Sequence, residues 1–528
     1  MTSSPVRNTA RRVFGHDDLL PGQADATAAL LDGHDVLLVA PTGAGKSLVY
    51  LVGGVLTDGP TLVVSPLLAL QQDQIDRIEA APGNVHAARI SSAETERQRD
   101  EVLSRAADGE VDFLFLAPEQ LANDEVRRRL AGLGPGLVAV DEAHCVSAWG
   151  HDFRPEYLRL GELVGQLGAP RVVAMTATAA PPVRDDIVER LRLTDPRTFV
   201  TGFARPNIAL EVQRAADESE QRSRVLDAVG EGTGIVYCRT RRATEEYAAA
   251  LAERGVRVAV YHAGLAHRRR QAAHEAFMSD AVDVVVATSA FGMGIDKPTV
   301  RFVVHAQVPE SPDTYYQEVG RAGRDGAAAT ATLVYRPEDL SLGRFFSSAV
   351  PRPGDVERVL EAAAAVGTEP AAVAEHSGLG RRKVSRILNL HEDAQQTVDS
   401  GDDPVLGVTR LAESRRSLER SRVEMMRAYA ETDRCRAEFL VGYFGERLGE
   451  RCGVCDSCRA GTAPEPAEDE GAPYALQEQV RHEEFGPGVV TDLEEDRLTV
   501  LFDEVGYRTL SLEVVAEQEL LVPLDRPG

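Results

Sequence analysis

The feature that most limits the fold of this chain is the alternation of short apolar runs with helical patterns over its first two thirds. Runs of this kind are typical of strands that are buried on both faces of a parallel sheet. They fall into two series, one at 36–39, 61–64, 112–116, 137–140 and 171–175, the other at 234–237, 256–260, 283–287, 301–305 and 331–335. A connector with Gly and Pro, at 201–207, separates the series. We therefore expect two α/β domains in tandem.

Changes in composition place the other domain boundaries. After residue 342 the apolar runs stop and an Ala/Arg-rich helical pattern follows, then an acidic Pro-rich stretch that predicts a flexible linker. The tail returns to short alternating strands, which indicates a small β-barrel. The predicted segments are 1–203 and 208–342 for the α/β domains, 343–424 helical, 425–460 cysteine-bearing, 461–473 linker and 474–528 β.

Residues 40–47 read Ala-Pro-Thr-Gly-Ala-Gly-Lys-Ser between a predicted strand and a helical stretch. Backbone N–H groups of such a loop can cradle phosphates, while Lys46 reaches the terminal phosphates and the Ser47 hydroxyl suits Mg²⁺. The first position is Ala where the strict motif has Gly, so a plain glycine turn is the alternative. Context favours the phosphate loop, because only three lysines occur in the chain. The predicted ATP contacts here are Thr42, Gly43, Gly45, Lys46 and Ser47.

An acidic pair, Asp141-Glu142, follows the run at 137–140 and lies 95 positions after Lys46. Asp141 is expected to hold Mg²⁺ through water, and Glu142 to position or deprotonate the attacking water. Such a pair alone is uninformative, but together with the phosphate loop it predicts a nucleotidase. With Ala143-His144 it spells the DEAH box of helicases.

The second α/β domain ends with two arginines three positions apart, Arg321 and Arg324, inside 317–326. On one helix turn both could face a phosphate across an interdomain cleft. An exposed basic helix end is the alternative, although the neighbouring glycines, which weaken a helix, favour the functional interpretation. The arrangement predicts a cleft that closes on ATP and opens after hydrolysis, as in a translocase.

Four of the six cysteines, Cys435, Cys452, Cys455 and Cys458, fall within 24 positions. Four thiolates at this spacing form the ligand set of a closed structural Zn²⁺ site. Free cysteines or a redox pair explain the spacing less well. We therefore predict Zn²⁺ in a structural role.

The net charge of −25 argues against a protein that coats nucleic acid by bulk positive charge. Any nucleic-acid path must then be a local basic channel. No apolar run reaches about 18 residues and the N-terminus lacks an apolar signal core, so we expect no membrane span and a cytoplasmic protein.

These motifs together resemble the RecQ helicases of superfamily 2. The most diagnostic stretch is 145–157, Cys-Val-Ser-Ala-Trp-Gly-His-Asp-Phe-Arg-Pro-Glu-Tyr, which is similar to the aromatic-rich loop that senses single-stranded DNA in that family. Trp149, the only tryptophan, and Phe153 offer faces on which bases can stack, and Arg154 offers a cation. Core packing is the alternative for a lone tryptophan. The DNA-binding residues implied are Trp149, His151, Phe153 and Arg154.

The resemblance covers roughly residues 10–345 and 425–460. It implies two RecA-like domains, ATP, Mg²⁺ and Zn²⁺ as cofactors, single-stranded and duplex DNA as partners, and 3′-to-5′ unwinding in repair or recombination. Gln317 and Gln23 are expected at the nucleotide, with Gln23 on the base edge. His16 stands where the family has an aromatic residue on adenine, so strict adenine preference is in doubt, and Ala148 replaces a usual Gln.

The usual winged helix and the helicase-and-RNaseD C-terminal domain do not both fit in the remaining residues. Instead, 371–388 resembles a helix-turn-helix with a turn at Gly378, and a helical spacer with a basic face is an equal alternative. Its cations are Arg381, Arg382, Lys383 and Arg386. The tail is similar to the SH3/Tudor-like domain of UvrD/PcrA-type helicases, which implies a protein partner such as RNA polymerase.

Two other functions compete with DNA unwinding. An RNA helicase shares the DEAH box, but the aromatic-rich loop and the cysteine module favour DNA. A DNA-binding regulator or translocase that uses ATP as a switch, without strand separation, is the alternative from another class. Strand displacement on a tailed duplex discriminates between them.

Overall fold

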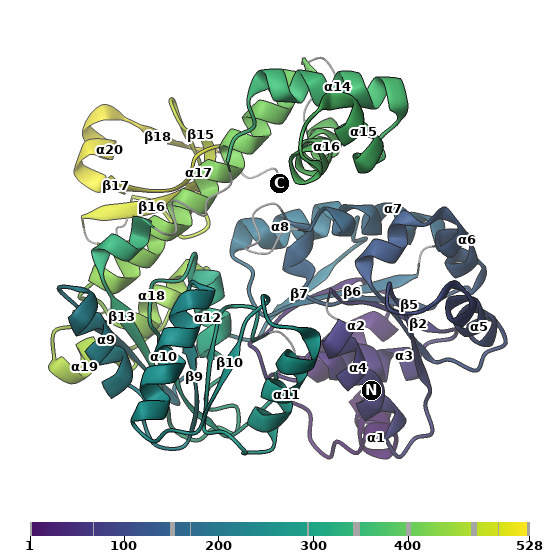
Figure 1. Ribbon diagram of the computed structural model, residues 1–528, viewed down its shortest axis with the longest axis horizontal. Helices are drawn as coiled ribbons and strands as arrows, with labels where there is room; N and C mark the ends of the chain where they lie inside the picture. Colours follow the sequence, from purple (N-terminus) through teal and green to yellow (C-terminus); the bar gives the residue numbers. More distant parts are fainter. Residues whose placement is uncertain are drawn as a thin grey trace. The chain divides into compact units, whose positions relative to one another are not determined.

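The computed structural model describes residues 3–66, 68–147, 154–168, 170–292, 295–341, 349–397, 403–465, 473–494 and 496–524. They form two compact units (Figure 1). The first unit is Met1–Arg336 with Thr432–Pro466, and the second is Pro337–Glu431 with Ala467–Gly528. None of the helices in the described ranges combines the length and apolar character needed to cross a bilayer.

The first lobe of the first unit is a seven-stranded parallel sheet in the order β3-β4-β2-β5-β6-β1-β7, with helices on both faces. Its strands are β1 (Val36–Val39), β2 (Thr61–Val64), β3 (Ala87–Ile90), β4 (Phe113–Leu116), β5 (Leu137–Val140), β6 (Arg171–Thr176) and β7 (Arg197–Val200). The helices are α1 (Ser3–Phe14), α2 (Gln23–Leu31), α3 (Ser47–Val55), α4 (Leu68–Glu79), α5 (Glu96–Ala107), α6 (Asp124–Gly132), α7 (Leu160–Gln166) and α8 (Pro181–Arg190). All five predicted strands are confirmed.

The second lobe is a six-stranded parallel sheet in the order β10-β11-β9-β12-β13-β8. Its strands are β8 (Ile208–Arg214), β9 (Thr233–Tyr237), β10 (Val258–Tyr261), β11 (Val284–Ala287), β12 (Val300–His305) and β13 (Ala329–Tyr335). The helices are α9 (Glu218–Asp227), α10 (Arg241–Glu253), α11 (His267–Met278) and α12 (Pro312–Val319). The predicted tandem of RecA-like domains is therefore confirmed.

Strand register places the motifs. In the first lobe β1 pairs with β6, and β5 lies between β6 and β2, all parallel. Because the carboxyl ends of parallel strands meet at one edge, the segments after β1, β5 and β6 come together there. These segments are the phosphate loop, the acidic pair and the stretch that begins at Thr176.

The cysteine-bearing module, with α18 (Arg436–Tyr443) and α19 (Asp456–Ala460), packs within the first unit. The Phe444 ring stacks on Phe203 of the interlobe connector, with centroids 4.4 Å apart. The Tyr443 hydroxyl donates to Asp313 of α12. These contacts place the module against the connector and the second lobe.

The second unit contains α14 (Pro353–Val366), α15 (Pro370–Ser377), α16 (Arg381–Thr397) and α17 (Pro404–Glu431), which share an apolar core. Gly378 ends α15 in the left-handed conformation at φ 68°, as the predicted turn requires. The second helix of the pair is longer than expected, because α16 continues for 17 residues.

The tail forms a five-stranded antiparallel sheet in the order β17-β16-β15-β14-β18, with its own apolar core. Its elements are β14 (Gln479–His482), β15 (Gly486–Leu493), β16 (Arg497–Phe502), β17 (Gly506–Ser511), α20 (Leu512–Gln518) and β18 (Leu521–Pro523). The predicted small β domain is thus confirmed as an antiparallel sheet that packs on α17.

Candidate active site and metal centre

One cleft of the first unit gathers almost every residue that the sequence predicts for nucleotide chemistry. The loop between β1 and α3 supplies one wall, and Gly43 and Gly45 there have φ of +88° and +63°, which favour glycine. The end of β5 supplies the acidic pair, and the segment after α12 supplies the arginines. The predicted residues in the lining are Thr42, Gly43, Gly45, Lys46, Ser47, Asp141, Glu142, Gln317, Arg321 and Arg324.

Lys46 is held inside the phosphate loop. Its Nζ donates to the carbonyl oxygens of Ala40 at 2.9 Å and Pro41 at 3.3 Å. Burial lowers the pKa of Lys46, and the carboxylates of Glu142 and Asp141 oppose that shift. The ammonium is therefore placed between the loop and the acidic pair, where a phosphate can replace the carbonyl bonds.

The acidic pair is strained and incompletely bonded. Burial, and then the neighbouring Glu142, raise the pKa of Asp141 to about 7, against the opposing effect of Lys46. Glu142 has φ +49°, a conformation that costs a non-glycine residue about 1 kcal/mol or more. Its Oε2 is buried with no hydrogen-bond partner among the described residues. Two carboxylates in this state fit a Mg²⁺ ion and its bound water, because hard oxygen ligands are what Mg²⁺ prefers.

A chain of hydrogen bonds links the acidic box to the second lobe. His144, 3% exposed, lies 2.8 Å from Thr176 through its Nδ1. The Thr176 hydroxyl donates to the Thr178 carbonyl, so His144 is the donor to Thr176. Gln317 Nε2 of α12 then donates to Thr178 Oγ1 at 3.0 Å. Movement of one lobe relative to the other therefore has to break or remake this chain.

The two arginines line the cleft, but the prediction that they lie on one helix turn is wrong. Helix α12 ends at Val319, and both follow in a turn where Gly323 has φ +57°. A Cβ on Gly323 would lie 2.4 Å from Asn207 Nδ2, so only glycine fits at this position between the two arginines. The Nε atoms of Arg321 and Arg324 are both buried without a hydrogen-bond partner in the described part of the chain.

Asp296 is a residue of this cleft that the sequence did not single out. Its two carboxylate oxygens pair with Arg77 of α4 and with Arg324, each at 2.9 Å. Burial raises the pKa of Asp296, but Arg324 and Arg77 outweigh burial, so the pKa lies below its usual range. Burial, and then Arg321, lower the pKa of Arg324 to about 10. The only signal in the sequence was the position of Asp296 beside Lys297, one of the three lysines of the chain.

Gln23 does not line the cleft, although the resemblance placed it on the base edge. The side chain is 4% exposed, and its Oε1 accepts from the Leu20 backbone at 2.8 Å. Its Nε2 donates to the carbonyls of Ala44 and Gly45 at 3.0 and 2.9 Å. The amide thus braces the phosphate loop.

Most of the predicted DNA-sensing loop, Trp149, His151 and Phe153, lies outside the described residues. Arg154 is described: its backbone N–H donates to the Cys145 carbonyl, and its Nη1 lies 3.4 Å from the Pro66 carbonyl. Arg154, which directly follows the undescribed residues 148–153, therefore lies next to the acidic box.

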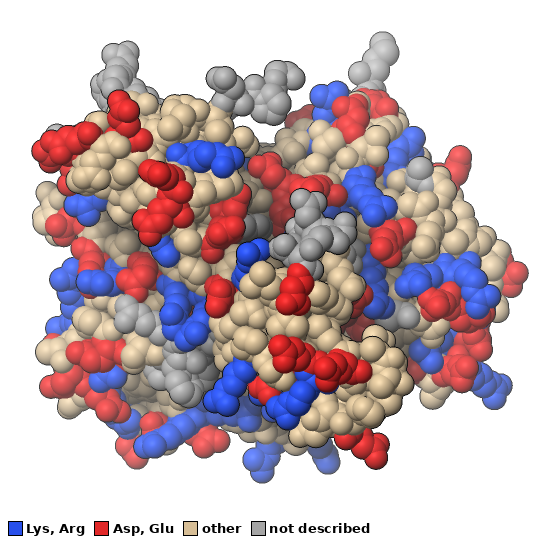
Figure 2. Space-filling model, turned by 90° about the horizontal axis from the view of Figure 1, so that it is seen from above, with Lys and Arg blue, Asp and Glu red and all other residues tan. Residues whose placement is uncertain are grey.

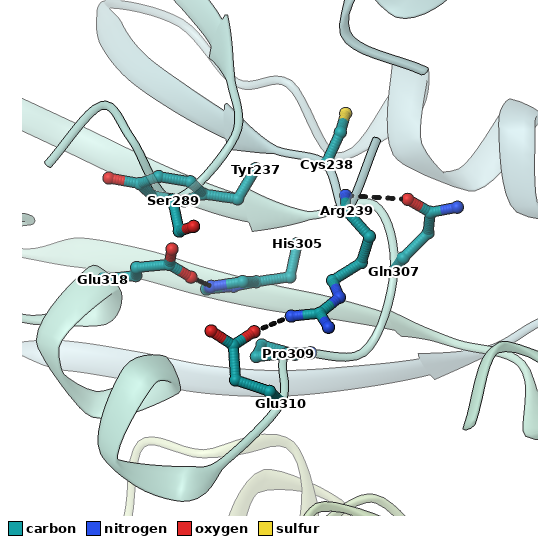
Figure 3. A pocket seen from close by; sticks show the side chains of 9 residues that line it. All are labelled: Tyr237, Cys238, Arg239, Ser289, His305, Gln307, Pro309, Glu310 and Glu318. Atoms are coloured by element: carbon teal, nitrogen blue, oxygen red, sulfur yellow. Dashed lines mark hydrogen bonds and ion pairs between the residues drawn. The ribbon is translucent and has the colours of Figure 1, made fainter. Parts of the chain in front are cut away.

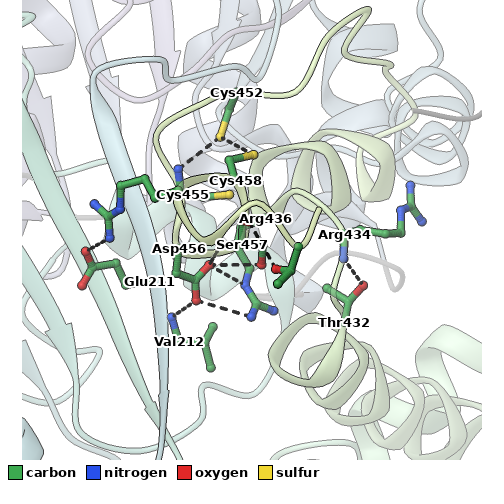
Figure 4. Close-up of polar contacts among 12 residues, drawn as sticks. Glu211, Val212, Thr432, Arg434, Arg436, Cys452, Cys455, Asp456, Ser457 and Cys458 are labelled. Carbon is green, nitrogen blue, oxygen red and sulfur yellow. Dashed lines mark hydrogen bonds and ion pairs between the residues drawn. The ribbon is translucent and has the colours of Figure 1, made fainter. Parts of the chain in front are cut away.

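The four predicted cysteines come together as one cluster, and Figure 4 shows three of them, Cys452, Cys455 and Cys458. All four Sγ atoms lie within 4.8 Å of one another, which suits a single tetrahedral Zn²⁺. Outside the thiols, Asp456 accepts from Arg436 Nε at 3.0 Å and from the Val212 backbone of β8 at 2.9 Å. The cluster is therefore connected to the second lobe through the residue that follows Cys455.

A second pocket in the second lobe lies at the carboxyl ends of β9 and β12 (Figure 3). Its polar groups are paired with one another: His305 Nε2 lies 2.8 Å from Glu318, and Arg239 forms an ion pair with Glu310. The Arg239 backbone N–H also donates to Gln307. Apart from the apolar runs at 234–237 and 301–305, which predict its two strands, the sequence did not indicate this pocket.

Family models match three parts of the chain. The DEAD/DEAH box helicase model matches residues 20–187, the helicase conserved C-terminal domain 220–326, and the RecQ zinc-binding model 391–459. The fold is similar to that of Mycobacterium smegmatis helicase Lhr bound to ssDNA and AMP-PNP, with a TM-score of 0.52 and 23% identity over 74% of this chain and 57% of that one. It is also similar to that of DUF1998 helicase MrfA bound to DNA, with a TM-score of 0.53 and 18% identity over 63% of this chain and 51% of that one. At such identities these two structures bear on the fold alone.

Curated relatives align over most of the chain. ATP-dependent DNA helicase RecQ of Bacillus subtilis is 34% identical over 451 residues, 84% of this chain and 65% of the relative. RecQ of Haemophilus influenzae is 34% identical over 448 residues, 85% of this chain and 62% of the relative. "Probable ATP-dependent DNA helicase RecS" of Bacillus subtilis is 39% identical over 363 residues, 67% of this chain and 73% of the relative. The chain thus spans less than two thirds of the length of the two RecQ proteins.

Proposed function

Because the chain belongs to the RecQ family of helicases, we propose that it hydrolyses ATP to separate the strands of duplex DNA. The observation that carries the proposal is the cleft itself. It sets the phosphate loop and acidic pair of one lobe against Arg321 and Arg324 of the other. The buried Nε atoms of these arginines lack a hydrogen-bond partner among the described residues, as expected of groups that await an anion.

The residues divide the work of hydrolysis. Lys46 exchanges its carbonyl contacts for the terminal phosphates, and the two arginines stabilise charge that develops on the transferred phosphoryl group. Ser47 and Asp141 would hold Mg²⁺, which supplies positive charge to the phosphates. Glu142 orients the attacking water and accepts its proton through Oε2, which is buried without a hydrogen-bond partner among the described residues and lies 3.4 Å from His144 Nδ1.

The hydrogen-bond chain from His144 through Thr176 and Thr178 to Gln317 supports coupling between hydrolysis and lobe movement. Asp296 pairs at once with Arg324 of its own lobe and with Arg77 of α4 in the other lobe, so these two ion pairs can rearrange as ATP binds and the lobes move. A cycle of closing and opening on single-stranded DNA gives translocation. By resemblance we assign DNA contacts to Trp149, His151, Phe153 and Arg154, and 3′-to-5′ polarity in repair or recombination.

Zn²⁺ at the four cysteines would serve structure, because four thiolates leave no open coordination position. The stacked pair of Phe444 and Phe203 and the bonds of Asp456 support this role, since they connect the module to the connector and the second lobe. A correctly folded module is then a condition for the lobe geometry on which the cleft depends.

Strand displacement tests the proposal. Duplexes with a 3′ tail, a 5′ tail or no tail, in DNA and in RNA, are incubated with the full chain, ATP and Mg²⁺. The proposal expects ATP-dependent separation of the 3′-tailed DNA. DNA-stimulated ATPase without displacement would overturn it in favour of a translocase or switch, and preference for tailed RNA would make the protein an RNA helicase.

A further inference from the structure

The second unit contains a hollow of about 430 Å³ that the proposed motor does not use. One side is α17 and the other is β17 of the antiparallel sheet. The α17 residues in its lining follow one another at alternating intervals of three and one, so they share one face of the helix. They are Glu413, Arg416, Ser417, Arg420, Ser421 and Glu424.

Close contact between the helix and the sheet builds the hollow. The Ser417 hydroxyl donates to the Val505 carbonyl, which directly precedes β17, at 3.0 Å. Gly506 has φ +75°, and a Cβ there would lie 2.3 Å from Ser421 Oγ and 3.0 Å from Leu418 Cα. Only glycine lets the strand lie this close to α17, so the two walls are held at a fixed separation.

Three arginines, Arg416, Arg420 and Arg508, line the hollow without a carboxylate partner among the described residues. The Nε of Arg416 is buried and has no hydrogen-bond partner there. Among the described residues, Arg508 donates to the Tyr507 carbonyl and lies 6.0 Å from the Phe485 ring. Of the two glutamates, Glu424 is paired with Arg427 and Glu413 is exposed at the rim.

Unpaired arginines are unexpected in a chain with 83 acidic and 58 basic residues. Figure 2 shows basic and acidic side chains interspersed over the face in view, so acidic partners are abundant. In the same unit, the predicted helix-turn-helix cations are partly neutralised, because Lys383 pairs with Asp355 and Arg381 lies 3.9 Å from Glu369. The hollow is therefore a better anion site than the helix-turn-helix.

We propose that the hollow between α17 and β17 binds backbone phosphates of DNA, through the guanidinium groups of Arg416, Arg420 and Arg508. Guanidinium forks match phosphate oxygens in pairs, and a site between a helix and a strand presents several forks to neighbouring phosphates. The site gives the protein a hold on DNA apart from the ATP cleft. The inference rests on the proposed function only for the choice of DNA as the molecule that carries the phosphates.

The test measures binding of a fluorescent duplex to the full chain without ATP, by anisotropy over a range of salt concentrations. The slope of log K against log salt is negative, and each lost phosphate contact reduces its magnitude by about 0.9. R416Q/R420Q should therefore reduce the magnitude of the slope by about 1.8 and weaken binding roughly 30-fold at 0.15 M salt. R508K, which keeps charge but loses the fork, should weaken binding less. The matched control is R497Q, which removes one exposed arginine of β16 outside the hollow.

An unchanged slope and affinity in R416Q/R420Q would overturn the proposal. If inorganic phosphate then still raises the melting temperature of wild type but not of the variant, the site takes free phosphate. If instead a polyglutamate peptide binds the wild type but not R416Q/R420Q, the site takes an acidic protein segment. DNA-free ATPase and the melting temperature of each variant check folding. Because the binding assay contains no ATP, its result does not depend on whether the protein separates strands. Strand separation could likewise succeed even if the hollow does not bind DNA.

Discussion

The bracing of the phosphate loop by Gln23 leads to a prediction that separates two roles for one side chain. In Gln23→Glu the volume and the acceptor for the Leu20 N–H remain. The two donors to Ala44 and Gly45 are lost, and a carboxylate then faces their carbonyls. Each lost hydrogen bond costs about 1 kcal/mol, and unsatisfied buried carbonyls add to this. The braced conformation of the loop is thus destabilised by about 2–3 kcal/mol, which corresponds to a fall in kcat/KM of roughly 30- to 150-fold.

The assay compares kcat/KM for ATP and GTP hydrolysis in the presence of DNA. A brace acts on the loop that holds the phosphates of any nucleotide, so both values should fall by the same factor. The control is Gln166→Glu, the same substitution at an exposed position of α7, which should leave both kcat/KM values unchanged. A fall with ATP alone, with GTP hydrolysis unchanged, would refute the brace and restore base recognition as the role of Gln23.

Three further predictions concern the metal sites and the second unit. Cys452→Ser should abolish Zn²⁺ binding and lower the melting temperature; an unchanged metal content measured by atomic spectroscopy would contradict the tetrahedral site. Because the pKa of Asp141 is raised to about 7, protons compete with Mg²⁺ for this carboxylate below neutral pH. The Mg²⁺ concentration for half-maximal ATPase activity should therefore rise up to about tenfold for each pH unit below 7 and stay constant above it. A Mg²⁺ requirement that does not change from pH 6 to 8 would disprove this. Gly506→Ala should destabilise the second unit in urea by about 2–4 kcal/mol, because its Cβ meets Ser421 Oγ, whereas Gly486→Ala, also at positive φ but in open space, should cost only about 1 kcal/mol; equal losses would mean that backbone strain alone matters.

Strands buried on both faces were predictable from sequence, because a run such as Val36–Val39 has no polar position to obscure it. The three missed strands lack that signal. Ala87–Ile90 carries an arginine and two alanines, Arg197–Val200 is a half-exposed edge strand, and Ile208–Arg214 alternates with polar residues. All three strands lie at an edge of their sheet, where one side is less buried and polar residues are tolerated. Which strand lies at an edge is decided only when the whole lobe assembles.

The contents of the cleft were predictable in kind, since motifs at the carboxyl ends of parallel strands must meet. Contacts across the lobes were not. Arg77 and Asp296 are 219 positions apart, and only the packing of two separate sheets brings them together. The end of α12 at Val319, which leaves Arg321 and Arg324 in the following turn, was likewise not predicted from the pattern of residue types. Gln23 was assigned by resemblance, and its contacts depend on how the phosphate loop closes.

The most direct test of the account is ATP-driven separation of a 3′-tailed DNA duplex by wild type and by Glu142→Gln, in one fluorescence assay. The account predicts rapid displacement by the wild type. It also predicts a loss of at least about 100-fold in the variant, which removes the group that orients and deprotonates the attacking water while ATP and DNA still bind. Displacement by Glu142→Gln at the wild-type rate, or none by the wild type despite ATP hydrolysis, would contradict it.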